Sequence, residues 1–193
     1  MTNHSSVRRA RLYIVAVLCA AMSACVTWPV GTGEPFVDKT KGYAYTAPIG
    51  WYQSPAKLTR DKLRTFTRDG STLQNIVVGR IAHKNAFSSI DKDATPEMLP
   101  QDIAENVIAD IKAFLPNDTF TVQTNAPATL AGNEGVRISG EFVSEEGLRI
   151  RLTGYYANTE DGIYSAVFRA PTLHFYDQHI EEFETSVRTL RIL

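Results

Sequence analysis

The sequence predicts an α+β domain in which helices cover the faces of an antiparallel sheet. Three observations support this prediction: predicted strands and helices follow the order strands, helix, strands, helix; apolar residues recur at helical spacing in 95–115 and 171–187; and apolar and polar residues alternate between turn signals in 133–168. Helices with one apolar stripe and strands with one apolar face bury these surfaces by stacking in layers.

The first group of strands is marked by aromatic and β-branched residues between turn signals. Tyr43–Ala47 predicts a short strand, and the following Pro48-Ile49-Gly50-Trp51 predicts a turn. Leu63–Arg68 alternates and ends at Asp69-Gly70, a hairpin turn signal. Leu73–Ala82 contains four β-branched apolar residues and predicts an interior strand, and 85–95 predicts a polar connection.

Each predicted helix begins with a proline signal and carries an apolar stripe. Thr95-Pro96-Glu97 supplies a hydroxyl cap, a proline and an acid in the first turn, and Pro116 ends the first helix. Pro171-Thr172 opens the second, and 189–193 predicts a last strand or a helix tail. The stripes are Leu99, Ile103, Val107, Ile108, Ile111 and Leu115 in the first helix, and Tyr176, Ile180, Phe183 and Val187 in the second.

Three strands between the helices predict an antiparallel meander with one buried face. They cover 136–142, 148–156 and 163–168, and Glu146-Gly147 and Asp161-Gly162 mark the turns that join them.

The N-terminal segment predicts a lipoprotein signal. Three arginines precede the apolar run Leu12–Met22, which has about half of the roughly 20 residues that a membrane-spanning helix needs. Small residues Ser23 and Ala24 then precede Cys25. We expect residues 1–24 to be removed and Cys25 to be acylated. The resemblance to bacterial lipoproteins implies two or three acyl chains. The alternatives are an ordinary signal peptide cut near Ala24 and an uncleaved membrane anchor.

The rest of the chain predicts a tether followed by one globular domain. Residues 25–41 contain two prolines and two glycines after the cysteine and predict a lipidated, flexible tether, whereas 42–193 predicts a single domain. Without residues 1–24 the net charge is about −4, which offers no basic surface for nucleic acid. Val26 follows the cysteine instead of an Asp, which favours the outer membrane with the domain facing the periplasm.

The domain resembles the PsbP-like group, which includes the DcrB-type bacterial lipoproteins. The resemblance rests on Tyr43–Trp51, which is similar to the opening strand-Pro-x-Gly-Trp pattern of the group, and on Gly132-x-x-Gly135, which leads into a strand. It also rests on Tyr164–Phe168, followed by Ala170-Pro171 and a helix that ends at Val187. The resemblance implies an α/β/α sandwich around an antiparallel sheet, and proteins that bind other proteins instead of catalysing a reaction.

Candidate binding residues lie on the second strand of the meander and near the second helix. Arg149 and Arg151 point to the same face and are candidates for an anionic ligand, with a cross-strand acid as the alternative; Arg137 is expected opposite them and Glu141 on the other parity. His174, Asp177 and His179 are metal-ligand types, but their spacing favours a solvated helix face, and no metal or other cofactor is predicted. Trp51 is expected at the edge of the core, and sugar stacking is its alternative role.

No nucleophile elbow, phosphate loop or zinc-protease motif is present, so the sequence predicts no enzyme. We expect a lipid-anchored, non-catalytic envelope protein that binds or supports the assembly of another envelope protein. The alternative is a carrier of a small amphipathic or anionic ligand in a cleft between sheet and helix. A hydrolase would require a Ser or a carboxylate beside His174 or His179 in a pocket.

Overall fold

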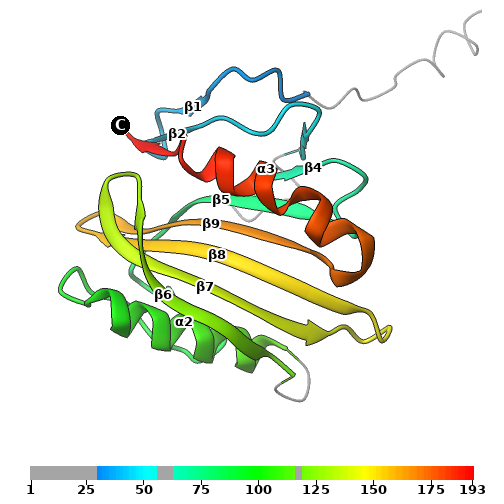
Figure 1. The fold of residues 1–193 in the computed structure, drawn as a ribbon. Helices are drawn as coiled ribbons and strands as arrows, with labels where there is room; N and C mark the ends of the chain where they lie inside the picture. Colours follow the sequence, from blue (N-terminus) through cyan, green and yellow to red (C-terminus); the bar gives the residue numbers. More distant parts are fainter. Residues whose placement is uncertain (1–29, 56–62, 116–118) are drawn as a thin grey trace, which may run out of the picture.

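A seven-stranded antiparallel sheet forms the middle layer of the computed structural model, which describes residues 30–55, 63–115 and 119–193 (Figure 1). The strand order is β3-β4-β5-β9-β8-β7-β6. The bounds are β3 Tyr52–Gln53, β4 Leu63–Thr67, β5 Asn75–Ile81, β6 Thr121–Leu130, β7 Asn133–Val143, β8 Arg149–Thr159 and β9 Gly162–Pro171.

The predicted meander is confirmed, with one strand more than the sequence analysis assigned. The strands β7, β8 and β9 pair in succession, and a two-residue turn at 160–161 joins the last two. The additional strand, β6, pairs with β7 at the edge of the sheet. It contains Pro127, which lacks an amide hydrogen and is tolerated in an edge strand.

Two helices lie on opposite faces of the sheet, as Figure 1 shows for α2 (Pro100–Phe114) and α3 (Asp177–Val187). The side chains of β9 point alternately to the two faces of the sheet. Tyr164, Ala166 and Phe168 pack with Phe183 of α3, whereas Ile163 packs with the apolar residues of α2. The predicted α+β sandwich is therefore confirmed, and the core is divided into two clusters by the sheet.

Both helices begin later than predicted. The first starts at Pro100, whose preceding residue Leu99 is extended and donates its backbone N–H to Asp102 Oδ2 at 2.9 Å. A helix that began at Pro96 would place Pro100 in its interior, where the ring clashes with the preceding turn. The second starts at Asp177, because His174 has a φ of 76° and ends helical geometry within the preceding turn, Thr172–Tyr176.

A second, three-stranded sheet covers part of the α3 face. Its order is β1-β2-β10, formed by Phe36–Asp38, Tyr43–Tyr45 and Arg191–Ile192. Tyr43 and Tyr45 are fully buried against β4 and β5, and Tyr43 Oη donates to the carbonyl of Val78 at 3.3 Å. Of the two alternatives for 189–193, the strand is present, as β10.

The expected tether over 25–41 is wrong for its described part. Val30 forms an isolated bridge with Tyr52, and Phe36–Asp38 is β1, paired with β2. Two neighbouring strands satisfy the backbone groups of this segment, which explains why its glycines and prolines do not make it a linker. Residues 1–29, which include Cys25 and the predicted signal peptide, lie outside the described residues.

One end of the seven-stranded sheet is called the Leu173 end below. The register places Tyr52, Thr67, Asn75, Pro171, Arg149 and Val143 at this end. The loops 68–74 and 144–148 and the turn 172–176 lie beyond it. The α3 helix starts here and runs towards the opposite end (Figure 1).

Candidate functional site

A groove lies beside α2, because this helix covers only part of its face of the sheet. The helix contacts β6, β7 and β8, and no helix of the described residues covers most of the corresponding face of β4, β5 and β9. On the other face, α3 and the three-stranded sheet together cover the core. The uncovered part holds a cavity of about 630 Å³, within the range of small-molecule sites.

Apolar side chains from the sheet, from α2 and from the loop before α2 form most of the groove. Val77, Leu152 and Val167 form the floor on the sheet, and Val107, Ile111 and Phe114 form the wall on α2. Phe87, in the loop before α2, closes the end near Ile81. The six residue steps of β5, from Asn75 to Ile81, give the floor a length of about 20 Å at about 3.3 Å per residue.

The other end of the groove holds Arg169, a cation for which the described residues provide no partner. Its register opposite Asn75 and Leu152 places it at the Leu173 end, where Ser71 and Thr72 also line the groove. No hydrogen bond or ion pair joins it to any residue in 30–55, 63–115 or 119–193. Burial lowers the pKa of its guanidinium, although the residue as a whole stays exposed at the mouth of the groove. An anionic group bound here would complete its missing contacts.

A carboxylate on α2 fixes the loop that closes the groove. Asp110 Oδ1 accepts the backbone N–H of Ser89 at 2.6 Å, so it holds loop residues 86–89 against the helix. Tyr156 lies beneath it on the sheet, and its pKa is raised, first by burial and then by the charge of Asp110. The acid therefore has a structural partner, in contrast to Arg169.

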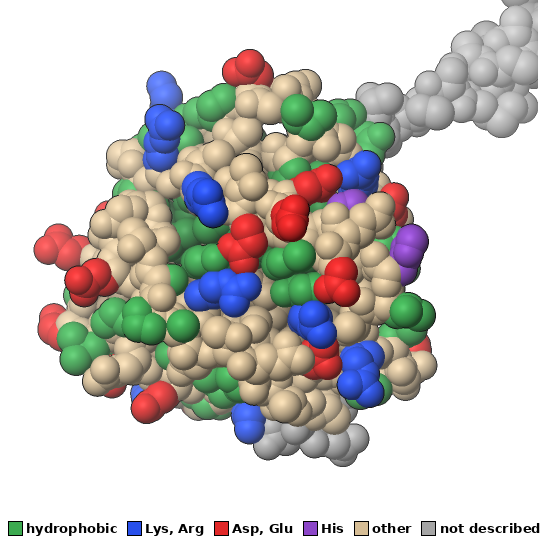
Figure 2. Space-filling model, viewed as in Figure 1, with side chains coloured by type: hydrophobic (Ala, Val, Ile, Leu, Met, Phe, Trp, Pro, Cys, Tyr) green, Lys and Arg blue, Asp and Glu red, His purple; other side chains and the backbone are tan. Residues whose placement is uncertain are grey.

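The two arginines expected to bind a ligand lie on the opposite face of the sheet. Arg151 donates from Nε to Glu141 Oε1 at 2.8 Å, and its guanidinium carbon lies 4.9 Å from the ring centre of Tyr176. Arg149 is 69% exposed and 3.6 Å from Glu141 Oε2. Glu141 pairs directly with Arg151 across the two strands, and its side chain lies on the same face of the sheet. The expectation that Glu141 points to the other face is therefore wrong. Figure 2 shows the resulting mixture of acidic and basic side chains on this side of the molecule.

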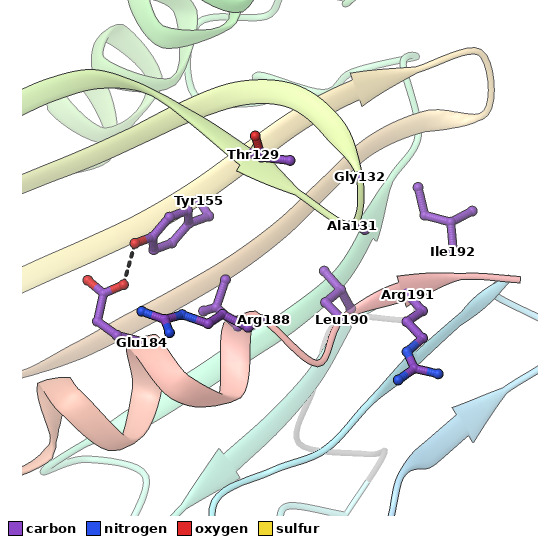
Figure 3. A pocket seen from close by; sticks show the side chains of 10 residues that line it. Thr129, Ala131, Gly132, Tyr155, Glu184, Arg188, Leu190, Arg191 and Ile192 are labelled. Atoms are coloured by element: carbon purple, nitrogen blue, oxygen red, sulfur yellow. Dashed lines mark hydrogen bonds between the residues drawn. The ribbon is translucent and has the colours of Figure 1, made fainter.

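A smaller, polar pocket of about 500 Å³ lies at the far end of α3 (Figure 3). Its central groups already pair with each other: Tyr155 Oη donates to Glu184, and Arg137 Nη2 donates to Glu184 Oε1 at 2.8 Å. The pKa of Tyr155 is raised to about 12, first by burial and then by its bond to Glu184. Arg188 and Arg191 also line this pocket.

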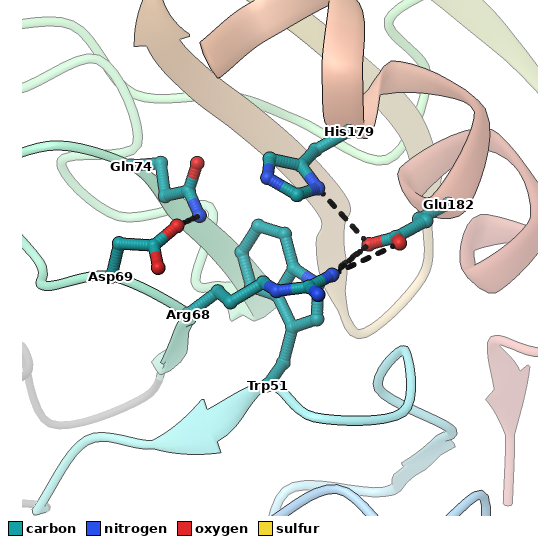
Figure 4. A network of polar contacts seen from close by, with 6 residues as sticks. All are labelled: Trp51, Arg68, Asp69, Gln74, His179 and Glu182. Carbon is teal, nitrogen blue, oxygen red and sulfur yellow. Dashed lines mark hydrogen bonds and ion pairs between the residues drawn. The ribbon is translucent and has the colours of Figure 1, made fainter.

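The region of the expected histidine cluster holds a closed polar network (Figure 4). Glu182 accepts Trp51 Nε1–H at 2.9 Å and Arg68 Nη1–H at 3.1 Å, and His179 Nδ1 lies 3.2 Å from the same carboxylate. The solvated face expected for His179 is wrong, because this residue is 2% exposed and packs edge-on against Trp51. Trp51 is fully buried, which confirms its core position and leaves no ring face for a sugar.

Two features are absent from residues 30–55, 63–115 and 119–193. No group of three or more His, Cys, Asp or Glu side chains there is arranged to hold a metal ion. No helix within the same ranges has both the length and the apolarity needed to cross a bilayer.

Sequence reasoning missed Arg169, although a signal for it was present. The predicted strand 163–168 ended one residue before it. With Ile163, Ser165 and Val167, Arg169 continues the alternate residues that face α2, so it is a charge on a predominantly apolar stripe.

Comparisons with known proteins identify the fold. No protein family matches this sequence, and no curated protein is significantly similar to it. The cyanobacterial PsbP protein CyanoP from Synechocystis has a TM-score of 0.54 and 10% identity, covering 90% of this chain and 99% of its own.

Two bacterial proteins have comparable folds. LpqN, involved in cell envelope biogenesis of Mycobacterium tuberculosis, has a TM-score of 0.52 and 13% identity over 83% of this chain and 85% of its own. A protein from Bacteroides thetaiotaomicron has a TM-score of 0.52 and 12% identity over 83% of this chain, which spans 48% of that protein. With its antiparallel sheet between two helices, the chain has the PsbP-like fold.

Proposed function

We propose that the protein is a lipid-anchored envelope protein that binds a small amphipathic ligand with an anionic group in the groove beside α2. The observation that carries the proposal is Arg169, which lies at the end of an apolar groove and has no partner among residues 30–55, 63–115 and 119–193. A cation partly removed from water is stabilised when an anion takes the place of the lost solvent. The apolar walls would hold the rest of the ligand.

The dimensions of the groove agree with a chain-like ligand. Its floor is about 20 Å long and its volume is about 630 Å³, which suits one extended apolar chain better than a compact polar molecule. The polar groups gather at one end, with Arg169 beside Ser71 and Thr72. We therefore infer a single ligand orientation, in which the anionic group lies at the Leu173 end.

The location follows from the sequence, as a second part of the proposal. Cys25 would be acylated after removal of residues 1–24, and the chain would be held at the periplasmic face of the outer membrane. Intact-mass measurement of protein from its native host tests this part. A mature chain that begins at another residue, or one without acyl chains, would refute it.

Binding of matched amphiphiles tests the groove. Laurate, dodecanol and dodecylammonium share an apolar chain and differ in charge. We expect laurate to bind best, and Arg169→Gln to weaken laurate about tenfold or more, because a hydrogen bond to a charged group contributes about 1.5–3 kcal/mol. Dodecanol should be affected little.

A matched control separates the site from general electrostatics. Arg149→Gln removes an equal charge from the opposite face and should leave laurate affinity unchanged. Val77→Phe, which fills the floor, should weaken all ligands that bind. Equal laurate affinity of the Arg169→Gln variant and the unchanged protein would contradict the proposal. Support of another envelope protein stays a prediction, which crosslinking in the intact envelope followed by mass spectrometry tests.

A further inference from the structure

Exposed apolar side chains gather at the Leu173 end of the sheet. They come from segments far apart in the sequence: the bridge and turn beside β3, the loop 68–74, the β7–β8 hairpin and the turn before α3. Their exposures range from 37% for Leu73 to 87% for Leu173. Six residues form this surface, which we call the apolar end: Val30, Ile49, Leu73, Val143, Leu148 and Leu173.

The most prominent of these side chains is held out by unusual backbone geometry. Leu173 is followed by His174, whose φ of 76° is uncommon for a residue other than glycine. Conformations of this kind cost free energy and persist only where the surrounding structure fixes them. Here the turn presents Leu173 to solvent, while Tyr176, three residues later, is buried in the core.

The point at which the chain joins the fold lies at the same end. Val30, the first described residue, pairs with Tyr52 at the start of β3. Only five residue steps separate it from Cys25, which limits their separation to about 18 Å even in a fully extended chain. The β8 strand alone spans about 33 Å, so the opposite end of the sheet lies much farther from this point of attachment.

We infer that the apolar end rests on the surface of the membrane that holds the acylated Cys25. This inference rests on the lipid anchor of the proposed function. The five-residue limit brings this end to the bilayer, and the six exposed side chains provide the apolar surface that an interface binds. The charges at this end are mixed, with Glu145 and Glu146 beside Arg149, so the contact depends on apolar burial and needs no anionic lipid.

Lipid-depth measurements on the full, acylated chain test the inference. In the mature acylated chain, Leu173→Cys or Leu148→Cys introduces the single free thiol, since Cys19 is removed with the signal and Cys25 carries the lipid. A fluorophore on that thiol is then measured in phosphatidylethanolamine–phosphatidylglycerol vesicles that contain a nitroxide-labelled lipid. The control is Val37→Cys, whose side chain is 49% exposed, against 51% for Leu148, but belongs to the three-stranded sheet.

We expect several-fold stronger quenching at 148 and 173 than at 37, with little change when salt is raised. Equal quenching at all three positions in an acylated chain would overturn this inference and leave the anchor intact. Quenching at 148 and 173 that disappears at high salt would also overturn it. A chain whose intact mass lacks acyl groups would instead refute the anchor itself, so the two failures are distinguishable.

Discussion

Three buried tyrosines make the stability of the fold sensitive to alkaline pH. Tyr43 and Tyr45 are fully buried and Tyr156 is 6% exposed. Burial raises the pKa of each of these hydroxyls, because the charged tyrosinate cannot be solvated in the core. In the unfolded chain each has a pKa of about 10. Above that pH the unfolded state therefore releases protons that the folded state retains.

The sign and size of the effect follow from linkage. Below pH of about 10 both states keep these protons, so the tyrosines cause no pH dependence there. Above it the free energy of unfolding falls, and three tyrosines together remove about 4 kcal/mol by pH of about 11. This is a large part of the 5–15 kcal/mol that is typical of a domain. We expect cooperative unfolding in this pH range.

Urea denaturation at a series of alkaline pH values measures the effect. Tyr45→Phe should lose stability at neutral pH, about 1 kcal/mol, because Tyr45 Oη and Ser186 Oγ lie 2.7 Å apart in a buried hydrogen bond. The same variant should lose less stability than the unchanged protein between neutral pH and pH of about 11, because one tyrosine that keeps its proton in the folded state is gone. Ser186→Ala is the matched control, since it removes the same hydrogen bond and keeps the tyrosine.

The reasoning is refuted by one of two results. The first is full tyrosinate absorbance near pH of about 11 in a chain that is still folded by circular dichroism. The second is an equal alkaline loss of stability in the Tyr45→Phe variant and the unchanged protein.

Two further substitutions test the packing of the core, both measured by urea denaturation. Phe183→Ala should cost about 3–5 kcal/mol, because Phe183 is fully buried with its ring centre 5.6 Å from that of Phe168; a cost as small as that of Leu193→Ala, at an exposed site, would contradict this packing. Gly140→Ala should cost about 1–3 kcal/mol, because the added methyl carbon would lie 2.6 Å from the carbonyl oxygen of Thr121; unchanged stability would contradict the close contact of β6 and β7.

Local sequence signals predicted most strands well and helix starts poorly. Asp161-Gly162 and the alternation around it identify the hairpin of β8 and β9, because turn chemistry and side-chain parity are properties of adjacent residues. The first helix has two candidate starting prolines, Pro96 and Pro100. Pro96 directly follows Thr95, whose hydroxyl is the better capping group for a helix N-terminus. The second proline decides the start, since a helix from Pro96 would contain Pro100 in its interior.

The groove depends on packing, which local patterns do not express. The apolar stripe of α2 predicts that the helix is packed on a sheet, but not which strands it covers. Likewise, the residues of the apolar end come from separate loops, and the strand order brings them together. The edge strand β6 was missed because Pro127 opposes strand assignment unless its position at an edge is known.

The strand order also constrains when the chain can fold. The β5 strand pairs on one side with β4 and on the other with β9, so 80 residues separate Ile81 from the Gly162 that begins its second neighbour. The β2 strand likewise needs Arg191 and Ile192 to complete its sheet. Neither sheet can close until nearly the whole sequence has been synthesised, and such distant pairings form slowly. A polypeptide with this strand order therefore keeps the edges of β5 and β2 unpaired until its C-terminal part has been made.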